Sequence, residues 1–265
     1  TEKIGDLTGI EAFVNITKLS CWGGELTSLD LSNNPLLETI ELVDNQISNI
    51  NLSQNTEVKV LWLETNSLTE VDISNNTKVE NIALGYNQLT SIDFTNNTLL
   101  WAITAEGNNL ESVDVSTNSN LTSLWVFENQ NLKTVIFPES SVLSRLGIWN
   151  TAIRGLDLST SPIERLYVQN NPELSYLNMR NGNNEAVTHF YVSGTPKLTC
   201  IASDDAVSDV MTTYAEGRLS EDCGTVSIPD ENFEQVLLDQ GIDTDGELNH
   251  LISRADAEAQ VGRLG

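Results

Sequence analysis

The feature that most constrains this chain is a repeat of about 21 residues, which runs through most of its 265 residues. The segment 37–57, LETIELVDNQISNINLSQNTE, is a clear copy, and it holds two apolar sets of the form L-x-x-L-x-L separated by Asn45. A fixed period of this length dictates the architecture, because each repeat forms one structural unit that stacks on the next. The sequence therefore predicts a solenoid in which one repeat makes one coil.

Nine copies of the repeat lie within residues 16–203. The last two apolar residues of each L-x-x-L-x-L set alternate, which places both on one face of a short strand. A coil of about 21 residues has no room for a full helix beside two such extended segments. The predicted fold is a mostly β repeat solenoid, a rod or arc of about nine coils that is roughly 40 Å long at the usual strand spacing.

One asparagine of the repeat recurs with the same period. An asparagine side chain offers both donors and an acceptor, so a column of them can satisfy the turn backbone that the strands leave unpaired. We expect an internal structural ladder formed by Asn45, Asn66, Asn87, Asn108 and Asn129.

Aromatic residues concentrate at the fifth and seventh positions of the repeat, which alternate with the inward pair and are expected to face outward. Exposed aromatic residues rimmed by polar groups mark recognition surfaces for sugars or proteins. The alternative is that the rings pack laterally on one another and only shield the sheet. The predicted binding face consists of Trp22, Trp62, Trp125, Phe127, Trp149, Tyr167 and Tyr191.

The composition narrows the choice of partners. With 38 acidic and 13 basic residues the net charge is −25, which argues against nucleic acid or an anionic membrane surface as a partner. No apolar run approaches the roughly 18 residues of a membrane span, so no membrane insertion is expected.

Acidic residues raise the question of calcium. A second column, formed by Asp30, Asn51, Asp72, Asp93, Asp114 and Asp157, either binds calcium or caps turns. The segment 243–249, DTDGELN, resembles a calcium loop but lacks the third acidic position and the distal glutamate. The sequence predicts no metal site and no cofactor, with calcium as the alternative.

Catalytic motifs are missing from the sequence. The only histidines are His189 and His250, and no HExxH, GxSxG, P-loop or CxxC motif is present. Abundant carboxylates do not amount to a paired site. The chain is predicted not to be an enzyme.

These motifs resemble a known family. L-x-x-L-x-L-x-x-N-x-L is the leucine-rich-repeat signature, and LTSLDLSNN (26–34) resembles the 21-residue repeats of internalin J-like bacterial surface proteins and, more closely, secreted proteins of Bacteroidota. The resemblance implies a secreted protein or one at the bacterial cell surface. Cysteine is frequent at the sixth repeat position in those families, but here Cys21 alone occupies it, which indicates a small buried apolar residue.

The resemblance also divides the chain. Residues 1–15 read as a partial N-terminal cap, and residues 204–223 resemble a C-terminal cap. In that family the cap implies a disulfide between Cys200 and Cys223, where the alternative is two free thiols. Residues 224–265 resemble the N-terminal cap of a further repeat block, with a helix near 229–241 and a second short helix at 253–260.

Two functions are consistent with this organisation. In the first, the two ends look like halves of one cap motif, so the chain associates with itself head to tail in a surface filament or array. The residues expected at that contact are Ile4, Leu7, Ile10, Phe13, Phe233, Val236, Leu237, Val261 and Leu264. In the second, the chain is an adhesin or binding module that recognises a glycan or a protein through the aromatic face, and its ends reflect truncation of a tandem array.

Overall fold

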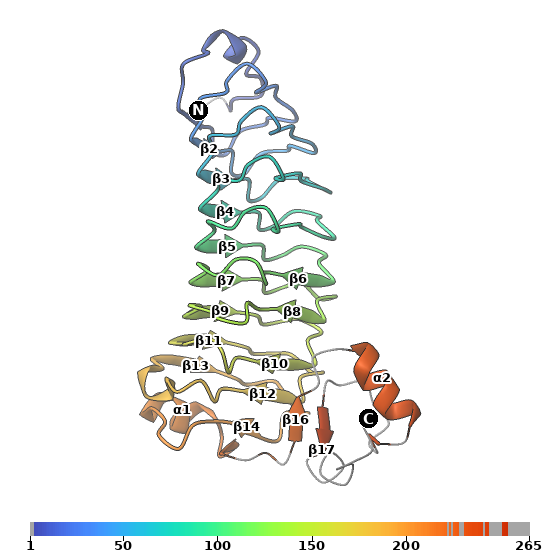
Figure 1. Cartoon of the computed structure of the whole chain (residues 1–265). Helices are drawn as coiled ribbons and strands as arrows, with labels where there is room; N and C mark the ends of the chain where they lie inside the picture. The colour runs from blue at the N-terminus through green and yellow to red at the C-terminus, as the bar shows by residue number, and fades with distance from the viewer. Residues whose placement is uncertain are drawn as a thin grey trace.

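The computed structural model describes residues 3–221, 223, 225–227, 231–240, 242–243 and 251–253. Coils stack one on another into a tall solenoid, with the N-terminal and C-terminal coils at opposite ends (Figure 1). One short strand from each predicted coil joins a nine-stranded parallel sheet, the first sheet. Its strands are β1 (Lys18–Ser20), β2 (Thr39–Glu41), β3 (Val60–Trp62), β4 (Asn81–Ala83), β5 (Ala102–Thr104), β7 (Ser123–Trp125), β9 (Arg145–Gly147), β11 (Arg165–Tyr167) and β13 (His189–Tyr191). The predicted solenoid is confirmed.

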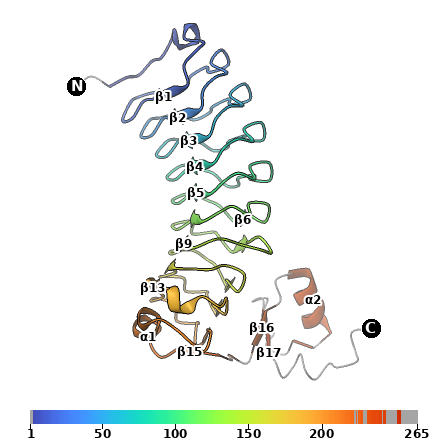
Figure 2. The ribbon, with the colours of Figure 1, turned by 60° about the vertical axis from the view of Figure 1, so that its left-hand side comes forward.

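The return side of the coils is less regular than the repeat predicts. Strands form there only from the fifth coil onward: β6 (Ser112–Asp114) pairs with β8 (Thr134–Ile136), and a four-stranded sheet contains β10 (Gly155–Asp157), β12 (Tyr176–Asn178), β14 (Ile201–Ala202) and β15 (Leu219–Ser220). The same side of the first four coils consists of turns and irregular extended chain, and the open loops are visible in Figure 2. The apolar pattern therefore fixed which residues point inward but not whether neighbouring backbones pair.

The core is a single column of apolar side chains inside the coils. Leu42, Leu63 and Leu84 occupy one repeat position in successive coils and are fully buried, and Cys21 is buried at the same position, as expected for a small apolar residue. Each buried aliphatic side chain contributes about 1.5–3 kcal/mol before entropy is subtracted. Because contacts are mostly between neighbours, stability depends on the interfaces between coils.

The predicted asparagine ladder is confirmed. The Asn87 amide nitrogen donates to the carbonyl oxygens of Leu63 and Leu84, both at 3.0 Å, and its Oδ1 accepts the backbone N–H of Leu68 at 3.0 Å. Equivalent bonds to the preceding coil are made by Asn45, Asn66, Asn108 and Asn129.

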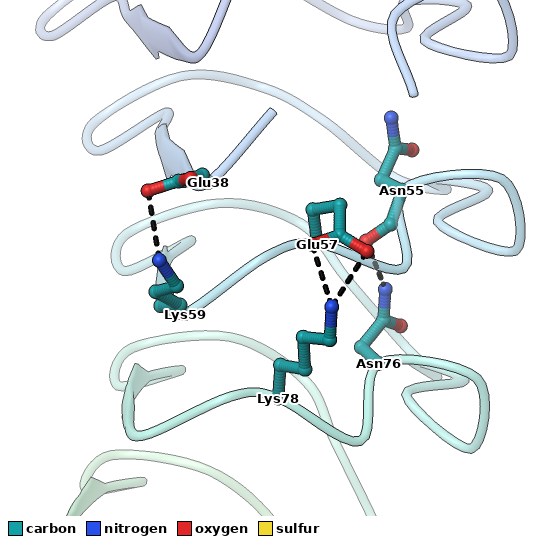
Figure 3. Close-up of polar contacts among 6 residues, drawn as sticks. All are labelled: Glu38, Asn55, Glu57, Lys59, Asn76 and Lys78. Carbon is teal, nitrogen blue, oxygen red and sulfur yellow. Dashed lines mark hydrogen bonds and ion pairs between the residues drawn. The ribbon is translucent and has the colours of Figure 1, made fainter. Parts of the chain in front are cut away.

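A second asparagine ladder on the return side was not predicted. The Asn76 amide nitrogen donates to the carbonyl oxygen of Leu52 at 3.1 Å. It also donates to the carbonyl oxygen of Asn55 at 2.9 Å (Figure 3). The other members are Asn34, Asn55, Asn97 and Asn118. Its signal in the sequence is a further asparagine that recurs at the same 21-residue interval.

Ion pairs also join residues one repeat apart. Lys59 contacts Glu38 at 2.9 Å and Lys78 contacts Glu57 at 2.6 Å, each across 21 positions (Figure 3). All four side chains are about half exposed, so each pair contributes at most about 1 kcal/mol.

A short 3₁₀ helix, η1 (Ile10–Ala12), lies over the first coil. Leu7, Ile10 and Ile16 pack against the core there. Asn34 donates to the carbonyl oxygens of Ile10 and Phe13, so η1 takes the place that a preceding coil would occupy in the second ladder.

The other end of the solenoid is closed by α1 (Asp209–Tyr214), which follows η2 (Asn184–Ala186) and β14. The disulfide between Cys200 and Cys223 is present, as the resemblance implied. Arg218 donates to the carbonyl oxygens of Val192 and Leu198, which are backbone acceptors of the last coil.

Beyond this cap, β16 (Thr225–Ser227) pairs antiparallel with β17 (Leu251–Ser253), and α2 (Glu231–Asp239) corresponds to the helix expected near 229–241. Leu237, Ile242 and Ile252 form a small separate core. Ser253 ends β17, and the remainder of the helix expected at 253–260 lies outside the described residues. Within the described part of the chain, no helix has the length and apolar character needed to cross a membrane.

Candidate functional site

The outward-facing side of the first sheet, here called the outer face, is a regular grid. Strand register aligns the last residue of each strand in one column, so that Trp62 pairs with Ala83, Ala83 with Thr104 and Thr104 with Trp125. The backbone bonds continue past the strands, which aligns a second column two residues further on. That column includes Glu64, Gly85, Glu106, Phe127 and Trp149.

Five predicted aromatic residues meet at the C-terminal half of this grid. We call Trp125, Phe127, Trp149, Tyr167 and Tyr191, together with Tyr214, the aromatic cluster. The rings of Phe127 and Trp149 stack with centroids 3.6 Å apart, Trp125 lies 5.5 Å from Tyr167, and Tyr167 stacks on Tyr191 at 5.3 Å. Lateral packing, which the sequence left as an alternative, therefore occurs, yet each of the five predicted rings keeps part of its surface in solvent.

Tyr214 extends the cluster and was missed from the sequence. It lies in α1, outside the repeat, and its ring is 5.4 Å from that of Tyr191. The 21-residue period could not predict its position, because Tyr214 comes beside the last strand only through the packing of the C-terminal cap. His189 also approaches the cluster, with its ring 6.1 Å from Tyr167.

The other two predicted residues of the binding face form a separate pair. The rings of Trp22 and Trp62 lie 6.1 Å apart, and the Trp62 indole N–H donates to Asn81 Oδ1 at 3.1 Å. Between this pair and the aromatic cluster lie the coils of β4 and β5, and the coil of β4 carries the small residues Ala83 and Gly85 at its two outward positions. The structure thus divides the predicted binding face into two aromatic groups. Between them is a part of the outer face around Ala83 and Gly85 without large side chains of its own, here called the low region.

Glutamates on the outer face have contrasting surroundings. Glu41 accepts bonds from Lys18 at 2.7 Å and Ser20 at 2.9 Å, and the bond from Lys18 lowers the pKa of its carboxyl. Burial instead raises the pKa of Glu64 and that of Glu106. The two latter carboxyls flank the low region.

The acidic column on the return side serves the backbone. Asp72 Oδ1 accepts the N–H of Ser74 at 2.9 Å, and the bonds from Ser74 lower the pKa of Asp72. The same turn recurs at Asp30, Asn51, Asp93, Asp114 and Asp157. No group of three His, Cys, Asp or Glu residues that could hold a metal ion occurs in the described ranges, and 244–249 of the calcium-like loop lie outside them.

The residues predicted for self-association have mixed positions. Ile4 is 50% exposed and Phe13 is 61% exposed, whereas Leu7 and Ile10 pack on the core. In α2, Val236 is 44% exposed and Leu237 is buried in the small separate core, so Leu237 is not available for a contact. The side chain of Phe233 and the residues Val261, Leu264 and His250 lie outside the described part.

Comparison with known proteins identifies the fold. No protein-family model and no curated protein matches the sequence. Among solved structures, the functional domain of InlJ from Listeria monocytogenes, which includes a cysteine ladder, is similar with a TM-score of 0.62 and 24% identity, over 73% of this chain and 48% of that one. The leucine-rich repeat domain of APL1B is similar with a TM-score of 0.55 and 16% identity, over 77% and 76% of the two chains.

The Arabidopsis receptor kinase HAESA, in complex with the peptide hormone IDA and the co-receptor SERK1, is similar with a TM-score of 0.52 and 19% identity, over 82% of this chain and 43% of that one. The chain thus spans about half of the InlJ structure and less of HAESA. At these identities the likeness concerns architecture, and it agrees with the stacked coils, the parallel first sheet and the asparagine ladder. The chain therefore has the leucine-rich-repeat fold.

Proposed function

We propose that this chain is an extracellular, non-catalytic binding module that recognises a protein ligand through the outer face of its first sheet. The observation that carries the proposal is the aromatic cluster, in which five predicted rings and Tyr214 gather on one surface. Binding energy in protein interfaces concentrates on such tryptophan and tyrosine anchors.

The geometry favours a protein over a glycan. Sugar stacking requires an open ring face, and one face of Phe127 and one face of Trp149 cover each other at 3.6 Å. The Trp125 ring lies over the backbone of Gly147, and its indole N–H is bonded to Ser123 at 2.8 Å. Tryptophan and tyrosine join an apolar ring to a polar N–H or O–H group, which suits a mixed protein surface. HAESA, which has the same fold, is in complex with a peptide and a protein.

The disulfide supports an extracellular setting, because such bonds persist in oxidising compartments. The chain has 38 acidic and 13 basic residues, and this excess of negative charge favours solubility and a basic partner.

The test is capture of proteins on an array of extracellular proteins, using the full chain and a Trp125→Ala/Trp149→Ala variant. Trp101→Ala is the matched control, since Trp101 is 44% exposed but lies before β5 and outside the aromatic cluster. We expect the double variant to lose at least about tenfold in affinity for captured proteins, because hot-spot truncation costs about 2 kcal/mol or more. Equal capture by all three proteins, with unchanged circular dichroism, would rule out the aromatic cluster.

A second candidate is head-to-tail self-association into a surface filament. The exposed side chains of Ile4, Phe13 and Val14 at the N-terminal end support it, as does Val236 near the opposite end. Heterologous contacts of this kind build an open filament when the rotation between neighbouring copies does not close a ring. Sedimentation of the full chain, of a Phe13→Ser variant and of a chain without residues 226–265 tests it. Concentration-dependent growth of the full chain alone is expected, and a monomer at high concentration in every case would exclude it.

A further inference from the structure

Two glutamates and a glycine form an unusual arrangement in the low region of the outer face. Glu64, Gly85 and Glu106 occupy the same column on three successive coils, as shown by the backbone bonds from Thr65 to Gly85 and from Tyr86 to Glu106. A Cβ placed on Gly85 would lie 2.6 Å from both Cδ and Oε1 of Glu106. The Glu106 carboxyl therefore occupies the side-chain space of Gly85, on the side toward Glu64.

This carboxyl is enclosed without a counterion. Glu106 is 8% exposed, and its Oε2 has no hydrogen-bond partner in the described structure. No lysine, arginine or histidine of the described residues forms an ion pair with Glu64 or Glu106. A buried carboxylate in this state is unfavourable unless a cation or donor is supplied.

Glu41 shows what the same face does when the cation comes from the chain itself. Glu41 is also 8% exposed, and Lys18 and Ser20 of the preceding coil bond both of its oxygens. Lys18 and Ser20 lie 23 and 21 residues before Glu41, and the corresponding positions before Glu106 hold Ala83 and Gly85, which carry no charge. The chain thus supplies a cation and a hydroxyl to the buried carboxyl of Glu41 but no cation to that of Glu106.

The surroundings add negative charge and an aromatic surface. The charges of Glu64 and Glu128 act on Glu106 in addition to its burial, and all three raise its pKa. Tyr86 is 47% exposed, and its ring lies over Gly107, where a Cβ would meet Tyr86 Cδ1 at 2.6 Å. Burial and then the charges of Glu128 and Glu106 raise the pKa of Tyr86, so this ring and the carboxyls share one neighbourhood.

We propose that Glu64, Glu106, Glu128 and Tyr86 form a site for a basic side chain, arginine or lysine, of the protein ligand. A guanidinium or ammonium group donates several hydrogen bonds to carboxylates and stacks on an aromatic ring. A metal ion is a poorer match, since the carboxylates of the described ranges, these three included, are not grouped closely enough to hold one. The inference rests on the proposed function and names the chemistry that the low region recognises between the two aromatic groups.

The test uses the full chain and a small probe, so it does not depend on finding the ligand. N-acetyl-arginine amide is titrated at pH 7 and low salt while the backbone amide signals are followed by NMR, with N-acetyl-citrulline amide as the neutral isostere. We expect the signals of Gly85, Tyr86 and Glu106 to shift when the arginine probe is added. The affinity for the citrulline probe should be lower by a factor of at least about ten, because that probe lacks the charge.

Variants complete the test. Glu106→Gln and Glu64→Gln should each weaken the arginine probe about tenfold, whereas Glu57→Gln, which removes an exposed ion pair with Lys78, should leave it unchanged. Equal binding of the two probes, shifts confined to other coils, or a response to CaCl2 but not to arginine would overturn the inference. Loss of array capture on removing Trp125 and Trp149 without any arginine response would refute this site alone. An arginine response together with equal array capture by the wild type and the Trp125→Ala/Trp149→Ala variant would refute the aromatic cluster alone.

Discussion

The indole ring of Trp125 occupies the space beside Gly147 in which a side chain at residue 147 would lie. A Cβ at Gly147 would collide with Cε3 of Trp125 and come 2.7 Å from its Cζ3. The two residues are paired on the adjacent strands β7 and β9. Because Gly147 has no side chain, the Trp125 ring can lie against the backbone of β9. The position of the central ring of the aromatic cluster is therefore set by a glycine.

Replacing Gly147 by alanine should displace Trp125. We expect a loss of about 1–3 kcal/mol in unfolding free energy, as for other overpacked positions, and a shift in tryptophan fluorescence. Gly5→Ala is the control, because a Cβ there meets only ordinary contacts at 3.8 Å or more. Urea denaturation measures the change, and equal midpoints for the two variants would contradict the role of Gly147.

Replacing Asn87 by alanine should weaken the first ladder. The N–H of Leu68 loses its partner inside the coil, whereas the carbonyl of Leu63 still accepts a bond from Asn66 at 3.1 Å. One buried unsatisfied group of this kind costs about 1–3 kcal/mol. Asn109→Ala removes an exposed asparagine of the next coil and should change the urea midpoint little. Faster hydrogen exchange around 63–68 in the Asn87 variant alone would locate the effect.

Stability should respond to pH with opposite signs at two buried glutamates. Because the folded pKa of Glu106 is raised above its ordinary 4.5, charging it destabilises the fold, and the penalty appears as pH rises through the folded pKa. Glu106→Gln should thus unfold at a higher urea midpoint than wild type at pH 7, and the difference should vanish below pH 4.5.

Glu41 provides the opposite case within the same experiment. Its pKa is lowered, so its stabilisation is present above 4.5 and is lost as pH falls through the folded pKa. Glu41→Gln should be less stable than wild type at pH 7, by about 0.5–1 kcal/mol because Lys18 is 57% exposed, and should approach it in acid. If both variants were more stable than wild type at pH 7, or both less stable, then the burial of Glu106 and the bond from Lys18 to Glu41 would not determine the effect of these carboxyls on stability.

Loss of the disulfide should loosen the C-terminal cap. Cys200 and Cys223 are separated by 23 residues, which corresponds to roughly 3 kcal/mol in the loop-entropy model. In a Cys200→Ser/Cys223→Ser variant, we expect faster hydrogen exchange in α1 and β14 and little change in β3 to β5. Cys21→Ser is the control that separates loss of the disulfide from loss of a thiol, since Cys21 is a free buried cysteine far from the cap.

The sequence alone determined the solenoid, its nine first-sheet strands, the buried column and the first asparagine ladder. The physical reason is that inward or outward orientation follows directly from a period of two within the strand, and stacking follows from a period of 21 along the chain. The disulfide of the cap came from the family resemblance, since spacing cannot assign partners.

Only the tertiary structure decided how the outward side chains use the surface. Trp125 leans over Gly147, Glu106 over Gly85 and Tyr86 over Gly107, so each side chain covers a glycine of a neighbouring coil. Tyr214 joins the aromatic cluster from a helix that has no repeat position. These contacts depend on side-chain direction and on which neighbour leaves space, and both are properties of adjacent coils in three dimensions that no single repeat contains.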